Sequence, residues 1–586
     1  MRNFFKIFFA SFLALVIFSV IAVLIGIWII SNAASSDKPE VGSKAVLVVD
    51  LGSPLMEQTK ENPLAEITGN ENSNALGLYD LVRLIRYAKT DSSVKGILIK
   101  AGYNANGFAT NEELREAIID FKQSKKFVLA YGEMMAQKSY FVATAADKIY
   151  CHPQGRVEWD GFSSGMLFLK GALDKLEIQP QIFYAGKYKS ATEPLRATEM
   201  TAPNREQTSV WLGDLYNEFL LAASKTRGID TGALHVLANT GAIQSAGDAL
   251  KNKLVDGLKY DDEWKAELSS MLGQKVTDKI NFITASKYSK AVDFKDSDAS
   301  DKIAIIYAEG DIVDGKGEDD NVSSDKFKNL IRKARMDNSI KAIVFRVNSP
   351  GGSSLASDVI WREITLARKE KPVVVSMGDV AASGGYYISC NADSIFADYT
   401  TITGSIGVFS IVPNMQSFFK NKLGVTFDRV KTAPFADMGS SDRPLTETEK
   451  GFFQSSVDSI YHTFKSRVAD GRKKDITYID SIAQGRVWTG TRAIQIGLVD
   501  RIGSLQKAVE CAARLAKVSS YRTREYPEQK SFYEQIFGSS NSNDIKEKVI
   551  KEEIGEPQYK MLKQVKKVQT LFGIPQTRLP FEFEIN

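Results

Sequence analysis

The chain has 586 residues, which is enough for two or more domains with separate cores. Charged residues make up 25% of it and hydrophobic residues 43%, values typical of globular proteins that argue against bulk disorder. The formal net charge of +4 gives no reason to expect a nucleic-acid partner. The chain has three Cys and no Cys or His cluster with metal-ligand spacing, so we predict no disulfide framework, no metal site and no cofactor.

The N-terminus begins with an uncharged apolar segment, from Ile7 to Ile30. This segment is long enough to cross a bilayer as a helix. It exceeds the roughly 7–15 apolar residues of a cleaved signal peptide, although the small residues 31–35 leave cleavage as the alternative. Arg2 and Lys6 precede the segment, which favours a cytoplasmic N-terminus and places the rest of the chain outside the cytoplasm. We therefore predict a single-pass anchor in residues 1–35.

The remainder of the chain contains an internal repeat. Tyr140 and Asp147 of the first copy correspond to Tyr386 and Asp393 of the second, at a constant offset. In each copy, short apolar strands alternate with amphipathic helices, a pattern that predicts an α/β fold with a parallel sheet. The expected strands are 45–51, 94–100 and 127–131, then 303–308, 340–346 and 373–377; the expected helices are 79–88 and 111–123, then 324–334 and 354–369.

The repeat also predicts the domain boundaries. The first copy extends over residues 43–292 and the second over residues 302–525, with the polar run 293–301 as the joint between them. Residues 526–586 form a C-terminal extension. It contains a charged stretch of helical pattern, 543–569, and a terminal segment from Leu579 to Glu584 that we expect to add an edge strand.

Each copy lacks one polar side chain that the other carries. Ser383 in the second copy corresponds to Gln137 in the first, whereas Lys189 in the first copy corresponds to Ala436 in the second. One repeat keeps a serine and the other keeps a lysine. This division predicts a single active site to which both repeats contribute.

Ser383 has the surroundings of a nucleophile. It follows a predicted strand and precedes Gly384 and Gly385, which favour a sharp strand-to-helix turn. The neighbouring strand runs into the glycine-containing segment 348–354, where backbone N–H groups can point outward as an oxyanion site requires. Both segments follow the carboxyl ends of parallel strands, where such sheets place their sites.

A serine nucleophile requires a base. His152, His235 and His462 have no supporting position in the sequence, so a Ser-His-Asp triad is not indicated. The alternative is a lysine whose pKa is lowered by burial in apolar surroundings. Lys187 and Lys189 lie in an apolar segment and would share one face of an extended strand, so their spacing does not choose between them.

Four motifs in the same order, around Tyr188-Lys189-Ser-Ala, Asn348-Ser-Pro-Gly-Gly, Ala-Ala-Ser383-Gly-Gly and Thr403-Gly-Ser405, resemble those of the signal peptide peptidase A (protease IV) family in its long tandem-repeat form. The resemblance implies two ClpP/crotonase-like repeats and a Ser-Lys dyad, with Ser383 as nucleophile and Lys189 as general base. It further implies that Ser405 orients the lysine and that the amides of Gly352 and Gly384 form the oxyanion hole.

The same resemblance implies a function and a location. It indicates a membrane-anchored serine endopeptidase that hydrolyses cleaved signal peptides and similar apolar peptides through an acyl-enzyme. It also implies a homotetramer in the bacterial inner (cytoplasmic) membrane, with the catalytic domains on the periplasmic side. Two other classes remain at this point: a crotonase-type acyl-transfer enzyme, and a membrane scaffold that has lost its peptidase activity.

Overall fold

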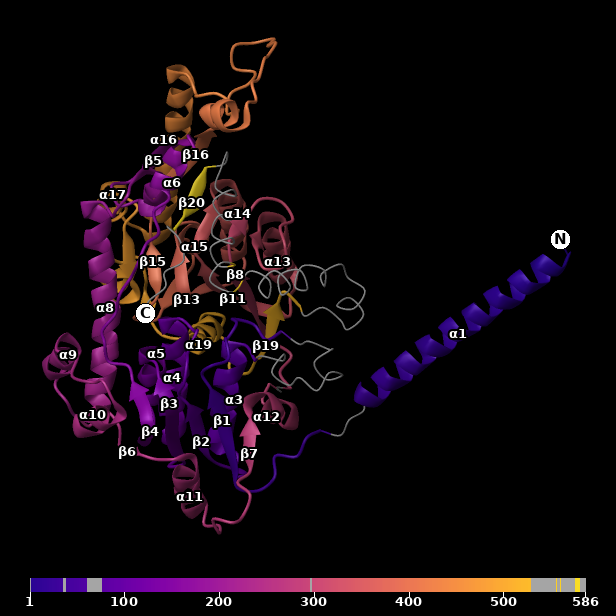
Figure 1. Cartoon of the computed structure of the whole chain (residues 1–586), viewed down its shortest axis with the longest axis vertical. Coiled ribbons are helices and arrows are strands. Elements are labelled where there is room, and N and C mark those ends of the chain that lie inside the picture. The colour runs from indigo at the N-terminus through magenta and orange to yellow at the C-terminus, as the bar shows by residue number, and fades with distance from the viewer. Residues whose placement is uncertain are drawn as a thin grey trace.

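The computed structural model describes residues 2–34, 38–60, 76–295, 298–528, 555, 559 and 575–579. Two α/β units lie one above the other, and helix α1 (Arg2–Ala34) projects away from them (Figure 1). Across these described residues, no helix combines the length and the apolar character needed to cross a membrane.

The first unit is built on a six-stranded sheet in which all neighbouring strands are parallel, in the order β6-β4-β3-β2-β1-β7. Helices cover both faces, as expected for a parallel sheet. The strands are β1 (Ala45–Asp50), β2 (Val94–Lys100), β3 (Phe127–Met135), β4 (Lys148–Val157), β6 (Gly257–Leu258) and β7 (Phe282–Thr284), and the helices are α3 (Leu78–Thr90), α4 (Phe108–Lys122), α5 (Gln137–Ala143), α11 (Asp261–Met271) and α12 (Ala285–Ala291).

The second unit repeats this plan. Its main sheet has the order β17-β15-β13-β11-β8-β19, with β14 and β18 continuing from β13. Every strand and helix predicted from the repeat is present in both units. The strands are β8 (Lys302–Glu309), β11 (Ile340–Ser349), β13 (Val373–Ala382), β14 (Ser394–Ala397), β15 (Ile402–Gly404), β17 (Val487–Thr489), β18 (Arg501–Ile502) and β19 (Arg522–Tyr526), and the helices are α13 (Ser324–Met336), α14 (Ser354–Arg368), α15 (Gly384–Ser389), α18 (Gly490–Gln495) and α19 (Leu505–Leu515).

A third sheet joins the two units, in the order β10-β9-β12-β20-β16-β5. Strand β5 of the first unit pairs along its whole length with β16 of the second. The C-terminal strand β20 lies between β12 and β16. Residues 580–584 of the predicted edge strand lie outside the described residues. The strands are β5 (Gln179–Ala185), β9 (Ile312–Val313), β10 (Val322–Ser323), β12 (Gly351–Ser353), β16 (Val408–Asn414) and β20 (Gln576–Arg578).

The remaining helices connect these layers. Helix α8 runs alongside both units (Figure 1). Residues 543–558 and 560–569 of the predicted charged helix lie outside the described residues, apart from Gly555. The other elements are α6 (Lys170–Lys175), the 3-10 helix η2 (Ser190–Thr192), α7 (Glu193–Arg196), α8 (Ala202–Arg227), α9 (Thr231–Asn239), α10 (Ala246–Lys251), the π-helix η3 (Phe418–Lys422), α16 (Glu447–Arg472) and α17 (Ile476–Ile482).

Buried charged groups fix one unit against the other. Arg346 of β11 is fully buried, and its guanidinium lies 2.7 Å from Glu57 and 2.7 Å from Glu113 of the first unit. Nearby, Thr110 of α4 donates its hydroxyl to Asp379, at 2.6 Å. Removing one partner of a buried ion pair typically costs about 3–5 kcal/mol, because the other charge stays buried without compensation. These contacts give the two units a defined mutual orientation.

Candidate active site

Ser383 lies at the junction between β13 and α15, where its backbone adopts a strained conformation with φ 54° and ψ −112°. Non-glycine residues at positive φ are uncommon, and such strain concentrates at functional sites. Gly385 allows the turn, because a Cβ there would lie 2.5 Å from the carbonyl oxygen of Ser349. The Ser383 N–H donates to the Gly404 carbonyl at 2.8 Å. The sharp strand-to-helix turn predicted around Ser383 is therefore present.

Lys189 reaches Ser383 from the other unit. It lies between β5 and η2, and its Nζ is 2.8 Å from Ser383 Oγ. The same nitrogen lies 3.2 Å from the carbonyl oxygen and 3.1 Å from the hydroxyl of Ser405. All three residues are buried. Burial holds the pKa of Lys189 well below its usual value, because the ammonium form loses its hydration.

Two glycines allow the chain to pass closely around Lys189. A Cβ on Gly485, which has φ +72°, would lie 2.7 Å from both the Cβ and the backbone nitrogen of Lys189. A Cβ on Gly407 would lie 3.1 Å from its Cδ. The Tyr188 N–H donates to the Gln484 carbonyl at 2.7 Å, which ties the lysine segment to the second unit. The amine position is therefore set by packing on both sides of its stem.

Gln207 of α8 is a positioning residue that sequence reasoning missed. Its side-chain nitrogen lies 3.0 Å from the Tyr188 carbonyl and 3.1 Å from the Ser190 hydroxyl. Its side-chain oxygen accepts a hydrogen bond from the N–H of Val487 in the second unit, at 3.1 Å. One amide thus holds the segment on both sides of Lys189 against strand β17. No local sequence signal marks this residue, because its partners are distant in the chain.

The structure separates the two candidate lysines. The Lys187 side chain is exposed, and its Nζ lies 5.3 Å from the centre of the Tyr188 ring, whereas Ser383 is buried. The histidines have other contacts. His152 packs edge-on against Tyr260, and the Nδ1 atom of His235 is 3.4 Å from the Tyr216 hydroxyl. Among the candidate bases, the structure therefore brings Lys189 to Ser383.

Gly352 and Gly384 both border strand β20. Gly352 is paired with Thr577 on one side and with Ile312 on the other. A Cβ on Gly384 would lie 2.9 Å from the Thr577 hydroxyl and 3.0 Å from its carbonyl oxygen. The two glycines therefore line the place where an extended peptide segment runs past Ser383.

The corresponding positions of the other copies have different environments. Gln137 begins helix α5, and its side-chain nitrogen donates to the Gly161 carbonyl at 2.9 Å. The Gly161 N–H donates back to the Gln137 side-chain oxygen at 3.1 Å. Ala436 lies in an exposed segment between β16 and α16. The two positions that lack the serine and the lysine thus have structural surroundings of their own.

Comparison with known proteins identifies the family. Residues 120–276 and 365–519 match the family model "Peptidase family S49", once in each unit. The chain is 35% identical to Protease 4 of Salmonella typhi over 89% of its own length and 87% of that protein. It is also 35% identical to Protease 4 of Haemophilus influenzae, over 84% of this chain and 83% of that protein. A solved ClpP1 from Listeria monocytogenes is similar over 35% of this chain and 94% of its own, with 14% identity and a TM-score of 0.24. Both repeats match the same family and the relatives are matched over most of their length, so this chain belongs to peptidase family S49.

Proposed function

We propose that the protein is a serine endopeptidase in which Ser383 is the nucleophile and Lys189 the general base. The observation that carries this proposal is the 2.8 Å contact between a buried lysine amine and a serine hydroxyl on a strained turn. Because the pKa of Lys189 is lowered, a larger fraction of its amine is uncharged near neutral pH than for an ordinary lysine. The lone pair of the uncharged amine can accept the serine proton. The presence of both groups disfavours a scaffold without catalytic function.

The reaction proceeds through an acyl-enzyme. Lys189 takes the proton of the Ser383 hydroxyl as the oxygen attacks the carbonyl carbon of the scissile peptide bond. The resulting ammonium then gives that proton to the leaving nitrogen as the C–N bond breaks. In the second half, Lys189 takes a proton from water as the water oxygen attacks the ester carbonyl. The lysine ammonium then returns that proton to Ser383 Oγ as the ester C–O bond breaks. The backbone amides of Gly352 and Gly384 are the donors we assign to the oxyanion.

Ser405 orients the lysine. Its carbonyl oxygen lies 3.2 Å from Lys189 Nζ and can accept one N–H of the amine. Its hydroxyl, at 3.1 Å, supplies a further partner on the same side. With its N–H groups directed to Ser405, the neutral amine keeps its lone pair for the Ser383 hydroxyl. Ser405 has a positive φ of 50°, and both of its polar groups lie within hydrogen-bonding distance of the amine.

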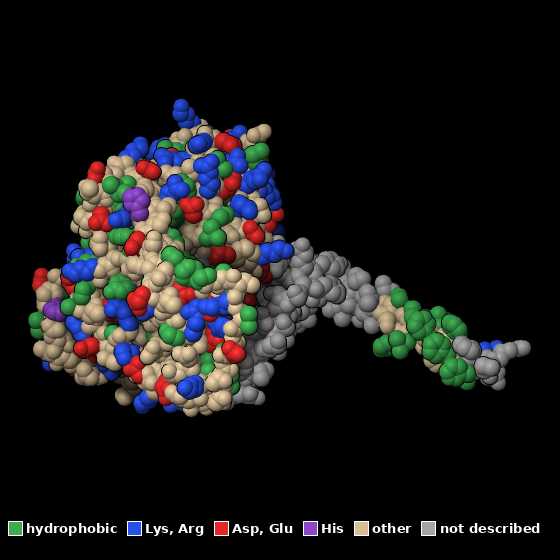
Figure 2. All heavy atoms as spheres, turned by 90° about the horizontal axis from the view of Figure 1, so that it is seen from above, with side chains coloured by type: hydrophobic (Ala, Val, Ile, Leu, Met, Phe, Trp, Pro, Cys, Tyr) green, Lys and Arg blue, Asp and Glu red, His purple; other side chains and the backbone are tan. Residues whose placement is uncertain are grey.

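We further propose that helix α1 anchors the enzyme in a membrane and that its substrates are apolar peptides, including cleaved signal peptides. Apolar side chains gather on the part of α1 that is coloured in Figure 2, away from the body. Phe4, Ile7, Leu15 and Phe18 are each 67–72% exposed, a surface that lipid would cover. Arg2 and Lys6 favour a cytoplasmic N-terminus, which places the site outside the cytoplasm, on the periplasmic side of a bacterial inner membrane.

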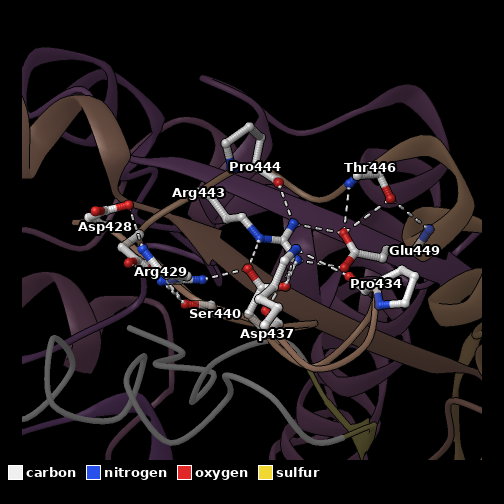
Figure 3. Close-up of polar contacts among 11 residues, drawn as sticks. Asp428, Arg429, Pro434, Asp437, Ser440, Arg443, Pro444, Thr446 and Glu449 are labelled. Carbon is white, nitrogen blue, oxygen red and sulfur yellow. Dashed lines mark hydrogen bonds and ion pairs between the residues drawn. The ribbon is translucent and has the colours of Figure 1, made fainter. Parts of the chain in front are cut away.

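The proposed assembly is a homotetramer. The segment between β16 and α16 lies at the top of Figure 1. It exposes large apolar side chains and contains a cluster of ion pairs. In Figure 3, Arg443 contacts Asp437 at 2.8 Å and Glu449 at 2.6 Å, while Arg429 reaches Asp437 at 2.8 Å. A second copy covering this face would bury Leu423, Val425, Phe427, Val430, Phe435 and Met438.

One experiment tests the catalytic proposal. The full-length protein in detergent is assayed for hydrolysis of an apolar peptide and for labelling by a fluorophosphonate. Ser383→Ala should lose labelling and hydrolysis, and Lys189→Ala should lose hydrolysis, whereas Lys187→Ala should keep both. Hydrolysis at the wild-type rate in either of the first two variants would refute the dyad.

Location and assembly need separate measurements. Resistance of the full-length protein to alkaline carbonate extraction, lost when residues 1–37 are removed, is the expected result for the anchor. Release of the intact protein by carbonate would contradict it. Light scattering of the detergent-solubilised protein should give four copies, and Val430→Asp should lower that number.

A further inference from the structure

The C-terminal strand β20 occupies a position that is not filled by the rest of the third sheet. It lies between β12 and β16 and is antiparallel to both. Neighbouring strands of a sheet are about 4.8 Å apart, so without β20 these two strands would be separated by the width of one extended chain. An extended peptide that adds to open strand edges is a common mode of peptide recognition.

Backbone contacts hold this segment in the register of a bound peptide. Gln576, Thr577 and Arg578 pair with Ser353, Gly352 and Gly351 of β12. At the two ends, Ser354 N–H donates to the Pro575 carbonyl at 3.3 Å, and Leu579 N–H donates to the Pro350 carbonyl at 2.8 Å. These contacts use main-chain groups, which any peptide possesses. The position can therefore accept peptides of other sequences.

The register places the Thr577 carbonyl beside Gly384, the residue that follows Ser383. A Cβ on Gly351 would lie 2.1 Å from the Thr577 carbonyl oxygen and 2.6 Å from the Gly384 nitrogen, so both atoms border one small space. Gly384 directly follows Ser383, and its amide is one of the two assigned to the oxyanion. The bond between Thr577 and Arg578 thus stands where a scissile bond would stand.

One side-chain contact in this segment is specific. The Arg578 guanidinium donates from Nη2 to both carboxylate oxygens of Asp311, at 2.6 Å each. The arginine side chain is only 9% exposed. Charge-assisted hydrogen bonds of this kind are stronger than neutral ones and gain further from burial. Asp311 immediately precedes β9. It therefore offers a binding site for a cationic side chain on the residue that follows the carbonyl group beside Gly384.

We propose that residues 576–578 occupy the peptide-binding position of this site, that they compete there with substrates, and that Asp311 selects a basic residue directly after the scissile bond. This inference rests on the proposed peptidase function. It assigns the substrate class as an extended peptide with Lys or Arg at that position. It also makes the C-terminal segment an internal competitor.

Competition is tested on the full-length protein with a fluorophosphonate and with a cleavable peptide that contains no basic residue. Arg578→Glu should raise the rate of Ser383 labelling and of hydrolysis about 10-fold, since loss of one charge-assisted contact corresponds to about that factor. Arg332→Glu, on the exposed face of α13, is the matched control and should change neither rate. Combining Asp311→Arg with Arg578→Glu should restore the slow rate. Equal rates in wild type, Arg578→Glu and the control would overturn the competition.

Selection is tested in the Arg578→Glu variant, where the position is open. Two peptides that differ only in having Arg or Ala after the scissile bond should differ about 10-fold in kcat/KM, in favour of Arg. Adding Asp311→Asn should lower kcat/KM for the Arg peptide about 10-fold and so abolish this preference. A preference for Arg that survives Asp311→Asn would overturn the role of Asp311.

Different results would contradict the peptidase mechanism and the roles of the C-terminal segment and Asp311. If Ser383→Ala hydrolyses the peptide as fast as wild type, the peptidase mechanism itself is wrong. If Ser383 is labelled and required, but neither Arg578→Glu nor Asp311→Asn changes a rate, only the inference about the C-terminal segment and Asp311 is wrong.

Discussion

The two repeats keep the same scaffold contacts and differ at the turn that follows their third strand. In the first unit, the Tyr140 hydroxyl donates to the Leu254 carbonyl at 2.7 Å; in the second, Tyr386 donates to Leu498 at 2.8 Å. The ion pair Arg227–Asp256 of the first unit corresponds to Arg472–Asp500 of the second. A lysine in each unit also donates to two backbone carbonyls at equivalent positions: Lys126 to Ala88 and Asp91, and Lys371 to Ala334 and Asp337.

At the turn itself the similarity ends. Ala136 precedes α5 with φ −64° and ψ 153°, an ordinary extended conformation, whereas Ser383 precedes α15 with φ 54° and ψ −112°. Strain of this kind costs about 1–3 kcal/mol and persists where the surroundings enforce it. The two units therefore share a scaffold but not this turn. In the mechanism that we propose, the strained turn and an amine from the other unit are both required.

The largest effect is expected at the two corresponding turns. Ser383→Ala should lower kcat/KM for an apolar peptide by about 10⁴-fold or more, the range seen when a nucleophile is removed from a serine peptidase. Gln137→Ser should create no second site, because residue 137 is the first residue of helix α5 and does not lie on a strained turn. Fluorophosphonate labelling with peptide mapping measures both. Fluorophosphonate labelling of the Gln137→Ser variant at residue 137 would show that a reactive serine does not need the strained turn.

The pH dependence should follow Lys189. Below its lowered pKa the amine is protonated and cannot accept the serine proton, so kcat/KM should fall about tenfold per pH unit as pH decreases. Lys189→Arg should be inactive throughout the neutral range, because guanidinium does not release its proton. A rate profile of Lys187→Ala that matches the wild type is the control. An active Lys189→Arg variant would exclude the lysine as base.

The same lowered pKa predicts an effect on stability. Between the lowered pKa of the folded state and the ordinary pKa of the unfolded chain, only the unfolded chain binds the proton. The free energy of unfolding should therefore rise with pH in this window, by up to about 1.4 kcal/mol per pH unit. Lys189→Met should lose this contribution, so urea unfolding of both proteins across the alkaline range should show a shallower slope in the variant. Parallel slopes would mean that the buried lysine is charged.

A smaller effect is expected at two corresponding glycines. Gly485→Ala places a Cβ 2.7 Å from the Lys189 stem and should displace the amine. Such a displacement should lower kcat about 10–100-fold with little change in KM. Gly241→Ala is the matched control: its φ of +58° brings similar backbone strain, but its Cβ would meet only the end of Gln244, at 3.4 Å. Equal losses of kcat in the two variants would show that strain, and not the displaced lysine, is responsible.

The features that could be predicted from the sequence are those that depend on local residue pattern and on the internal repeat. Apolar periodicity marked the strands and helices of both units, and comparison of the copies singled out Ser383 and Lys189. The choice of Lys189 over Lys187 came from the resemblance, since an extended strand places both on one face. In the structure the turn after β5 directs one inward and leaves the other exposed.

Contacts between distant segments were not predictable from that pattern. Gln207 acts through backbone groups of two other segments, so its identity leaves no local signal. Strand β20 is short and polar, so it has no apolar pattern from which it could have been predicted. Arg346 lies in a strand that was predicted from its apolar residues, so its ion pairs had no signal in that pattern. Its partners Glu57 and Glu113 belong to the other unit.

The smallest effects are expected at the corresponding tyrosines of the two units, Tyr140 and Tyr386. Tyr140 and Tyr386 are fully buried, and burial raises the pKa of both hydroxyls, so each remains a donor throughout the neutral range. Replacing either with Phe leaves a buried carbonyl without that donor, which typically costs about 1–3 kcal/mol. Urea unfolding should show similar losses for Tyr140→Phe and Tyr386→Phe. Only the second should also lower kcat, by a few fold, because Tyr386 fixes α15 directly behind the strained Ser383 turn. An equal loss of kcat in Tyr140→Phe would mean that the first unit affects catalysis through its own helix α5, and not only through the lysine it contributes.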